Sequence, residues 1–93
     1  MVVGTLELQL LIRGSQSLKD KRRVIKSLKD RVLHRFPVSI AEVGALDNLQ
    51  HGQLGVAVVS NDSRHATEVL SKIVDFVRGS FLAELVDYSI EVL

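Results

Sequence analysis

Apolar and polar residues alternate at both ends of this 93-residue chain. Residues 2–12 and 82–93 place apolar side chains at most of the even-numbered positions and polar side chains at many of the positions between them. A period of two is typical of a β-strand that buries one face, so each segment is predicted to be a strand. The polar faces of these two strands carry Glu7, Gln9, Asp87, Ser89 and Glu91.

Two other segments have apolar residues at the helical period of about 3.6. The first follows Ser17, which has an acidic residue three positions later, as in a helix N-cap, and it stops before Pro37. A helix is therefore predicted over residues 18–35. The second segment follows the cap candidates at 61–63 and keeps its helical spacing until Gly79.

Residues 38–43 and 53–60 are rich in apolar and β-branched side chains, and turn-forming residues separate them. They are predicted to form an antiparallel hairpin. The element order β-α-β-β-α-β then predicts an α+β sandwich, in which a four-stranded antiparallel sheet carries two helices on one face. Residues 1–93 should form a single domain, because a chain of this length supplies one core.

Composition narrows the class of protein. Hydrophobic residues make up 46% of the chain, and there is no cysteine. The lack of cysteine excludes disulfides and thiolate metal sites, and His34, His51 and His65 have no metal-ligand spacing. No apolar run approaches the roughly 18 residues that span a bilayer. We expect a cytoplasmic protein that has no membrane partner, metal site or cofactor.

Charge is distributed unevenly along a chain whose net charge is +1. Residues 13–35 contain nine Lys and Arg residues against two Asp residues, a net charge of +7. The rest of the chain contains three Lys and Arg residues against nine acidic residues, a net charge of −6. The near-neutral total therefore conceals a basic helix on an acidic body, which favours partners that bind in one orientation.

The basic helix is the first candidate for a binding surface. Helical geometry places one group of cations on its outward side and flank. This group comprises Lys19, Arg22, Arg23, Lys26 and Lys29. A row of exposed cations can contact backbone phosphates, so a nucleic acid, either RNA or DNA, is the predicted partner. The alternative interpretation is a solubilising helix face, with Arg31 and Arg35 complementing the helix dipole.

Lys21 lies in the first turn of the same helix and close to its buried stripe, where a cation opposes the positive end of the helix dipole. One interpretation is an anion-binding site formed by Ser15, Ser17 and Lys21 with the amides of the helix N-terminus. The other is a lysine that extends past the sheet edge to a carboxylate such as Glu42 or Glu84.

No catalytic residue is predicted. Acylphosphatases bind phosphate in the loop between their first strand and first helix, but here that loop lacks their glycine-rich pattern, and no P-loop motif follows it. Glu42 interrupts an apolar strand, which indicates either a paired carboxylate or a general acid or base. No serine has recognisable histidine and carboxylate partners. A nonenzymatic role is therefore preferred.

Three sequence stretches occur at characteristic distances: SLKDKR at 17–22, VSIAEV at 38–43 and GVAVVSND at 55–62. Together they resemble the YlxP-like family of small bacterial proteins of unknown function. The likeness covers nearly the whole chain and implies a ferredoxin-like fold, which agrees with the element order above. It also implies genomic neighbours that encode translation and ribosome-maturation factors. It brings no established catalytic residue or cofactor.

Two functions of different class follow as hypotheses. The first is a nonenzymatic nucleic-acid-binding or ribosome-associated accessory protein that acts through the basic helix. The second is a homo-oligomeric regulatory or assembly domain that binds a protein or a small anionic ligand, since a free sheet face and edge strands can pair between subunits. Base stacking on the sheet is not expected, because its central strands offer Glu7, Gln9 and Ala57 in place of aromatic residues.

Overall fold

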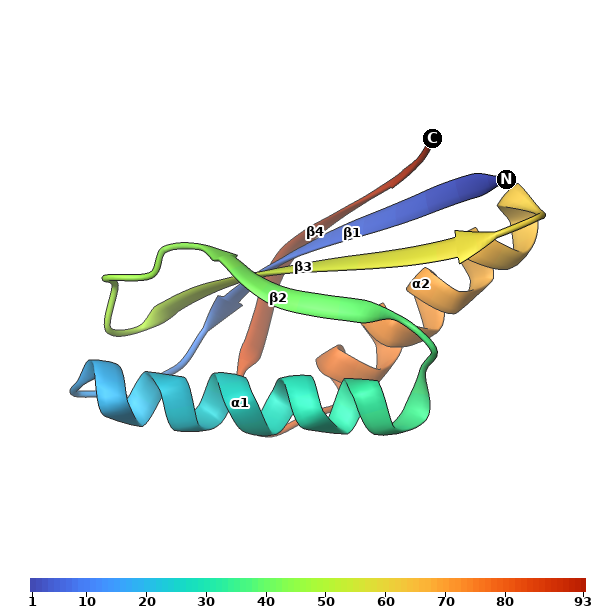
Figure 1. Ribbon diagram of the computed structural model, residues 1–93. Coiled ribbons are helices and arrows are strands. Elements are labelled where there is room, and N and C mark those ends of the chain that lie inside the picture. Colours follow the sequence, from blue (N-terminus) through green and yellow to red (C-terminus); the bar gives the residue numbers. More distant parts are fainter.

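The computed structural model describes residues 1–93 and has the predicted β-α-β-β-α-β order (Figure 1). Its elements are β1 (Val2–Leu11), α1 (Leu18–Arg35), β2 (Ser39–Gly44), β3 (His51–Ser60), α2 (Ser63–Arg78) and β4 (Glu84–Val92). The strands form one antiparallel sheet in the order β2-β3-β1-β4. Both helices lie on the same face of this sheet, which makes the chain a ferredoxin-like α+β sandwich.

Side-chain caps fix the start of each helix. The Asp20 backbone N–H donates to Ser17 Oγ at 3.1 Å, and the Gln16 N–H donates to the Asp20 carboxylate at 3.3 Å. At the start of α2, the Arg64 N–H donates to the Asp62 carboxylate at 3.0 Å. These bonds satisfy amides that have no partner within the helix, so local sequence is sufficient to set both starting points.

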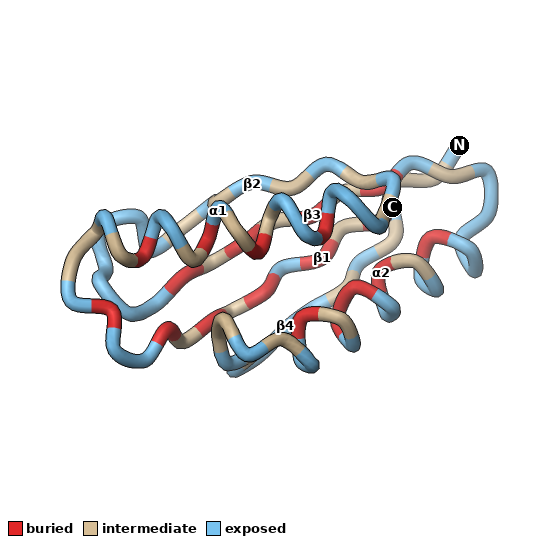
Figure 2. Tube along the Cα trace, turned by 90° about the horizontal axis from the view of Figure 1, so that it is seen from below, coloured by how far each residue is buried: buried red, intermediate tan, exposed pale blue.

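The hydrophobic core lies between the sheet and the helices. Alternate residues of β1 and β3 supply one side of it, including Leu8 and Leu54, which are fully buried. The helices supply the other side through residues such as Leu28 and Ile73. Figure 2 shows the buried positions of α1 and α2 turned toward the sheet. The opposite face of the sheet has no helix over it.

The two helices cover different parts of the sheet. α1 packs mainly against β2, whereas α2 packs against β1, β3 and β4. They run in opposite directions and lie side by side only along their C-terminal halves (Figures 1 and 2). Phe36 and Phe76 meet there edge to face, with ring centroids 5.9 Å apart. This stagger gives the molecule its elongated shape, 42 × 21 × 19 Å.

The strands β3 and β4 differ from their predicted ranges. β3 begins at His51, two residues early, because residues 51 and 52 pair with the end of β1. β4 begins at Glu84, two residues late, because residues 80–83 form the connection from α2. A register shift in the β1–β4 ladder leaves Val86 outside the pairing, and its side chain is exposed. The early start of β3 and the exposure of Val86 thus arise from pairing between distant segments.

Gly4 lies where α2 packs closely against the sheet. A Cβ atom at this position would lie 2.9 Å from Leu70 Cδ1 and 3.3 Å from Ala66 Cβ. Gly4→Val is therefore expected to lower the free energy of unfolding by about 2 kcal/mol, because the added methyl groups overpack the interface. Urea unfolding measures the change. The control is Thr5→Val on the open face, expected to stay within about 0.5 kcal/mol of the parent, and equal effects of both substitutions would contradict the packing argument.

Candidate nucleic-acid interface

The predicted cations gather on one flank of α1. Lys19, Arg22, Arg23 and Lys26 are exposed, and Lys29 is half-buried. A shallow groove between α1 and β2 is lined in part by Arg22, Lys26 and Lys29, with Ile25 and Ile40 among its apolar residues. The spacing of three to four residues brings these cations onto adjacent turns, as the helical projection predicts.

Few of the basic side chains have an acidic partner. Only three ion pairs form within 4.0 Å: Arg13–Glu84, Lys21–Glu42 and Lys26–Asp30. Of the five predicted binding residues, therefore, only Lys26 has a carboxylate partner, at 2.9 Å within the same helix. A solvent-exposed pair of this kind contributes about 0.3–0.5 kcal/mol, so an incoming phosphate can replace Asp30 as the partner of Lys26.

The opposite flank of α1 carries two further arginines and a histidine, which face α2. Arg31, His34 and Arg35 line a cleft that is closed on the other side by Phe76. The Arg35 guanidinium carbon lies 5.0 Å from the centroid of the Phe76 ring. Sequence reasoning assigned Arg31 and Arg35 to the helix dipole alone and did not connect them to Phe76. Their spacing of four residues indicated that Arg31 and Arg35 lie on the same side of α1. That this side faces Phe76 depends on how the two helices pack.

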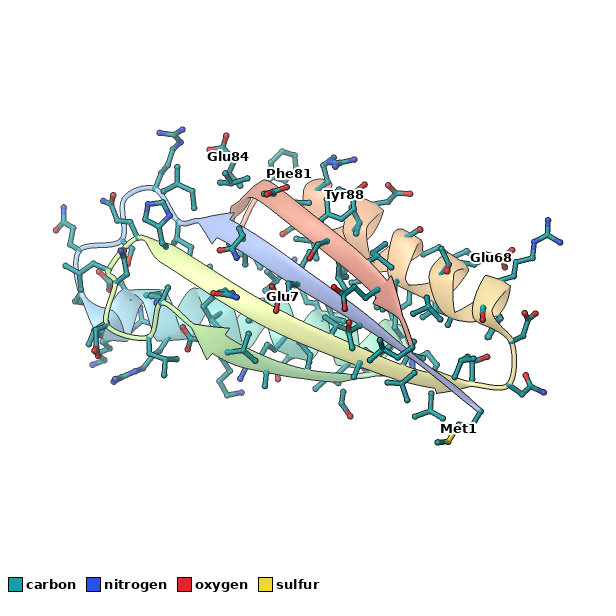
Figure 3. The ribbon with its side chains drawn as sticks, turned by 90° about the horizontal axis from the view of Figure 1, so that it is seen from above. Met1, Glu7, Glu68, Phe81, Glu84 and Tyr88 are labelled. Carbon is teal, nitrogen blue, oxygen red and sulfur yellow. The ribbon has the colours of Figure 1, made fainter.

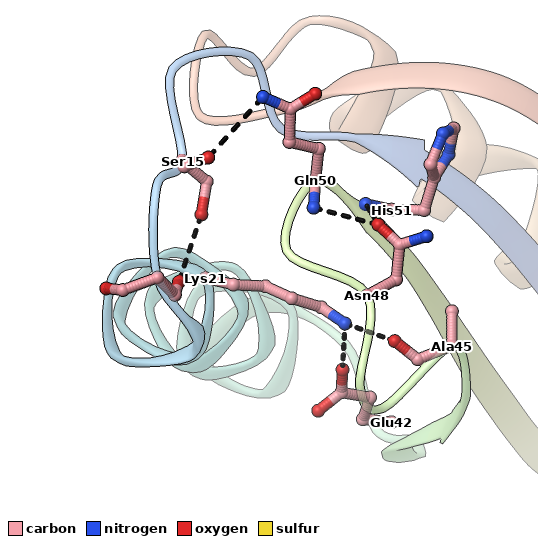
Figure 4. Close-up of polar contacts among 8 residues, drawn as sticks. Ser15, Lys21, Glu42, Ala45, Asn48, Gln50 and His51 are labelled. Carbon is pink, nitrogen blue, oxygen red and sulfur yellow. Dashed lines mark hydrogen bonds and ion pairs between the residues drawn. The ribbon is translucent and has the colours of Figure 1, made fainter.

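Lys21 is buried at the junction of α1 with the β2–β3 hairpin (Figure 4). Its side chain is 1% exposed, and its Nζ lies 3.2 Å from the Glu42 carboxylate and also donates to the Ala45 carbonyl oxygen. The predicted pairing with Glu42 is therefore confirmed, and Glu84 pairs with Arg13 instead. Ala45 has φ 55°, a left-handed conformation that is unfavourable for alanine, and the bond from Lys21 to its carbonyl oxygen holds the hairpin at this residue.

The remaining residues of the predicted anion site also have internal partners. Ser15 is 5% exposed; its hydroxyl donates to the Ser17 carbonyl oxygen, and its own carbonyl oxygen accepts from the Gln50 side chain (Figure 4). The Ser17 hydroxyl caps α1. Ser15, Ser17 and Lys21 thus join the first turn of α1 to the β2–β3 connection. Anion binding at these residues stays a prediction.

Comparison with known proteins places the chain in a family. The family described as "Protein of unknown function (DUF503)" matches residues 3–90, nearly the full chain. The chain belongs to the DUF503 family. It is also similar to the uncharacterized protein YlxP of Bacillus subtilis (strain 168), with 34% identity over 76 residues that cover 82% of this chain and 83% of YlxP. The resemblance seen in the sequence is therefore confirmed, and no activity is described for either the family or this relative.

One solved structure resembles this DUF503 protein over 98% of its length, with a TM-score of 0.45 and 14% sequence identity. It is the structure of a REP-associated tyrosine transposase bound to a REP hairpin. The DUF503 chain spans about half of that protein, covering 55% of it. A likeness this distant does not bear on function.

Two other features bear on the kind of site this DUF503 protein offers. No three of its His, Asp and Glu side chains come together in an arrangement that could hold a metal ion. Neither helix combines the length and apolar character needed to cross a membrane.

Proposed function

We propose that this DUF503 protein is a nonenzymatic accessory protein that binds RNA through the basic flank of α1. The observation that carries the proposal is that four of the five cations on this flank have no acidic partner. Lys19, Arg22, Arg23 and Lys29 have no carboxylate within 4.0 Å, although the chain contains eleven acidic residues. Unpaired cations held on one rigid helix produce a concentrated positive potential, which attracts a polyanion.

The arrangement favours contact with phosphates over contact with bases. The five side chains are Lys and Arg, whose charged groups bind phosphate oxygens without distinguishing between bases. The open face of the sheet is a poor surface for RNA. Glu7 and Glu91 lie on it and repel phosphates, and Ser89 beside them has no aromatic ring on which a base could stack. Figure 3 shows this face, with Glu7 near its centre. Binding is therefore expected to be independent of sequence.

The salt dependence of RNA affinity tests this mechanism. If the five cations contact phosphates of a single strand, raising the salt concentration from 50 to 200 mM should weaken binding about 100-fold, because each contact releases condensed counterions. Fluorescence anisotropy with a labelled oligoribonucleotide measures the dissociation constant at each concentration. Two RNAs of equal length and different sequence should give similar curves. A salt-independent affinity, or no binding at 50 mM, would contradict the proposal.

A further inference from the structure

Phe81 is the most exposed aromatic residue of the protein. Its side chain is fully open to solvent, with a relative exposure of 105%, in the connection between α2 and β4. Phe36 and Phe76, in contrast, pack against the core. Figure 3 shows Phe81 at the rim of the molecule beside Glu84, away from Glu7 on the sheet face. The fold therefore does not depend on the Phe81 ring.

Arginine residues flank this ring. Phe81 shares one cleft with Arg31, Arg35, Phe76 and Asp75 at the C-terminal ends of the two helices. Arg31 and Arg35 have no carboxylate within 4.0 Å. The Arg35 guanidinium lies over the face of the Phe76 ring. This contact covers that face and restricts the conformations of the Arg35 side chain. An unoccupied aromatic ring thus stands next to two cations without acidic partners.

On the far side of the ring, the basic residues are already engaged. Arg13 and Arg78 share a second cleft with Phe81, but Arg13 pairs with Glu84 at 3.0 Å. The Arg78 guanidinium lies 5.7 Å from the centroid of the Tyr88 ring. Of the four arginines that line the two clefts, only Arg31 contacts neither a carboxylate nor an aromatic ring, so a bound anion would approach Phe81 from the α1 side.

We propose that Phe81, Arg31 and Arg35 form a subsite for an unpaired nucleobase and its adjacent phosphate, so that the protein prefers single-stranded RNA. The inference rests on the proposed function and adds the form of RNA that is bound. A phenyl ring stacks on any base, and this contact is unavailable to bases held inside a duplex. The guanidinium groups of Arg31 and Arg35 supply forked donors for phosphate oxygens. The cleft on the α1 side holds two arginines against the single carboxylate of Asp75, which favours a polyanion there, whereas the cleft on the β4 side is lined largely by apolar residues.

The test compares Phe81→Ala with Phe81→Trp on single-stranded and double-stranded RNA of equal length at 50 mM salt. Phe81→Ala should weaken single-strand binding about 10-fold, the loss expected for one base stacked on an aromatic side chain, and leave duplex binding unchanged. Phe81→Trp should retain single-strand affinity, because the larger ring also stacks. Since the ring is exposed, both variants should keep the parent unfolding midpoint in urea.

Equal affinities of parent and Phe81→Ala for single-stranded RNA would overturn this subsite while leaving the salt-dependent binding of α1 in place. Loss of self-association in Phe81→Ala, with RNA affinity unchanged, would also overturn it and assign the ring to a protein interface. Failure of the unchanged protein to bind either RNA would contradict the proposed function itself and the subsite with it.

Discussion

Replacing Lys21 by methionine is expected to lower the free energy of unfolding by about 3 kcal/mol. Methionine keeps the length and apolar stem of the side chain but removes the ammonium group that contacts Glu42 and the Ala45 carbonyl oxygen. The Glu42 side chain is only 18% exposed, so its charge would be left partly buried without a partner. Removal of one member of a buried pair costs about 3–5 kcal/mol, and the exposure of Glu42 places the expected loss at the lower end. Equilibrium unfolding in urea measures it.

A second variant separates the charge effect from a packing effect. Lys21→Met combined with Glu42→Met should recover at least about 1 kcal/mol of the loss, because no unpaired charge remains near the hairpin. Lys19→Met, at an exposed position of the same helix, serves as the control and should stay within about 0.5 kcal/mol of the parent. If Lys21→Met is as stable as Lys19→Met, the pair does not hold the β2–β3 hairpin to α1.

Charge reversal on α1 is expected to produce the largest loss of RNA affinity. Arg22→Glu with Arg23→Glu should weaken binding about 50-fold at 50 mM salt, since each substitution removes a phosphate contact and adds a repulsive charge. Neither arginine has an ion-pair partner within 4.0 Å, so the fold should be unaffected. The same anisotropy measurement determines the ratio of dissociation constants.

The chain offers a matched control for this experiment on α2. Arg64→Glu with Lys72→Glu changes the net charge by the same amount, and both residues are exposed on the other helix. If position matters, this variant should lose less than about 5-fold in affinity, an effect of overall charge alone. Equal losses in the two variants would show that net charge, and not the flank of α1, governs binding.

Local signals predicted the helices closely. The Ser17 cap, the helical spacing of apolar residues and the following Pro37 predicted α1 over 18–35, the range that the structure shows. Strand ends were less accurate, because the first residues of β3 are ordered by pairing with the end of β1. The exposure of Val86 likewise follows from a register shift against β1 that its own alternation does not reveal.

The candidate interface was predictable in part, because helical geometry is a local property of the sequence. Helical geometry alone places Arg22, Lys26 and Lys29 on one flank, and the groove between α1 and β2 bears this out. Sequence also suggested a carboxylate such as Glu42 or Glu84 as the partner of Lys21, but it could not choose between them. The choice depended on where β2 and β4 lie relative to α1, which is set by sheet order.

The sequence by itself determined the element order, the helix boundaries and the basic character of α1, because capping, periodicity and charge are properties of neighbouring residues. Only the tertiary structure decided that Lys21 is buried against Glu42 and Ala45, and that Arg31, Arg35 and Phe81 line one cleft. Both arrangements bring together residues more than twenty positions apart in the chain. They arise from the stagger of α1 against α2 and the position of β2 at the sheet edge, both of which result from packing of the whole core.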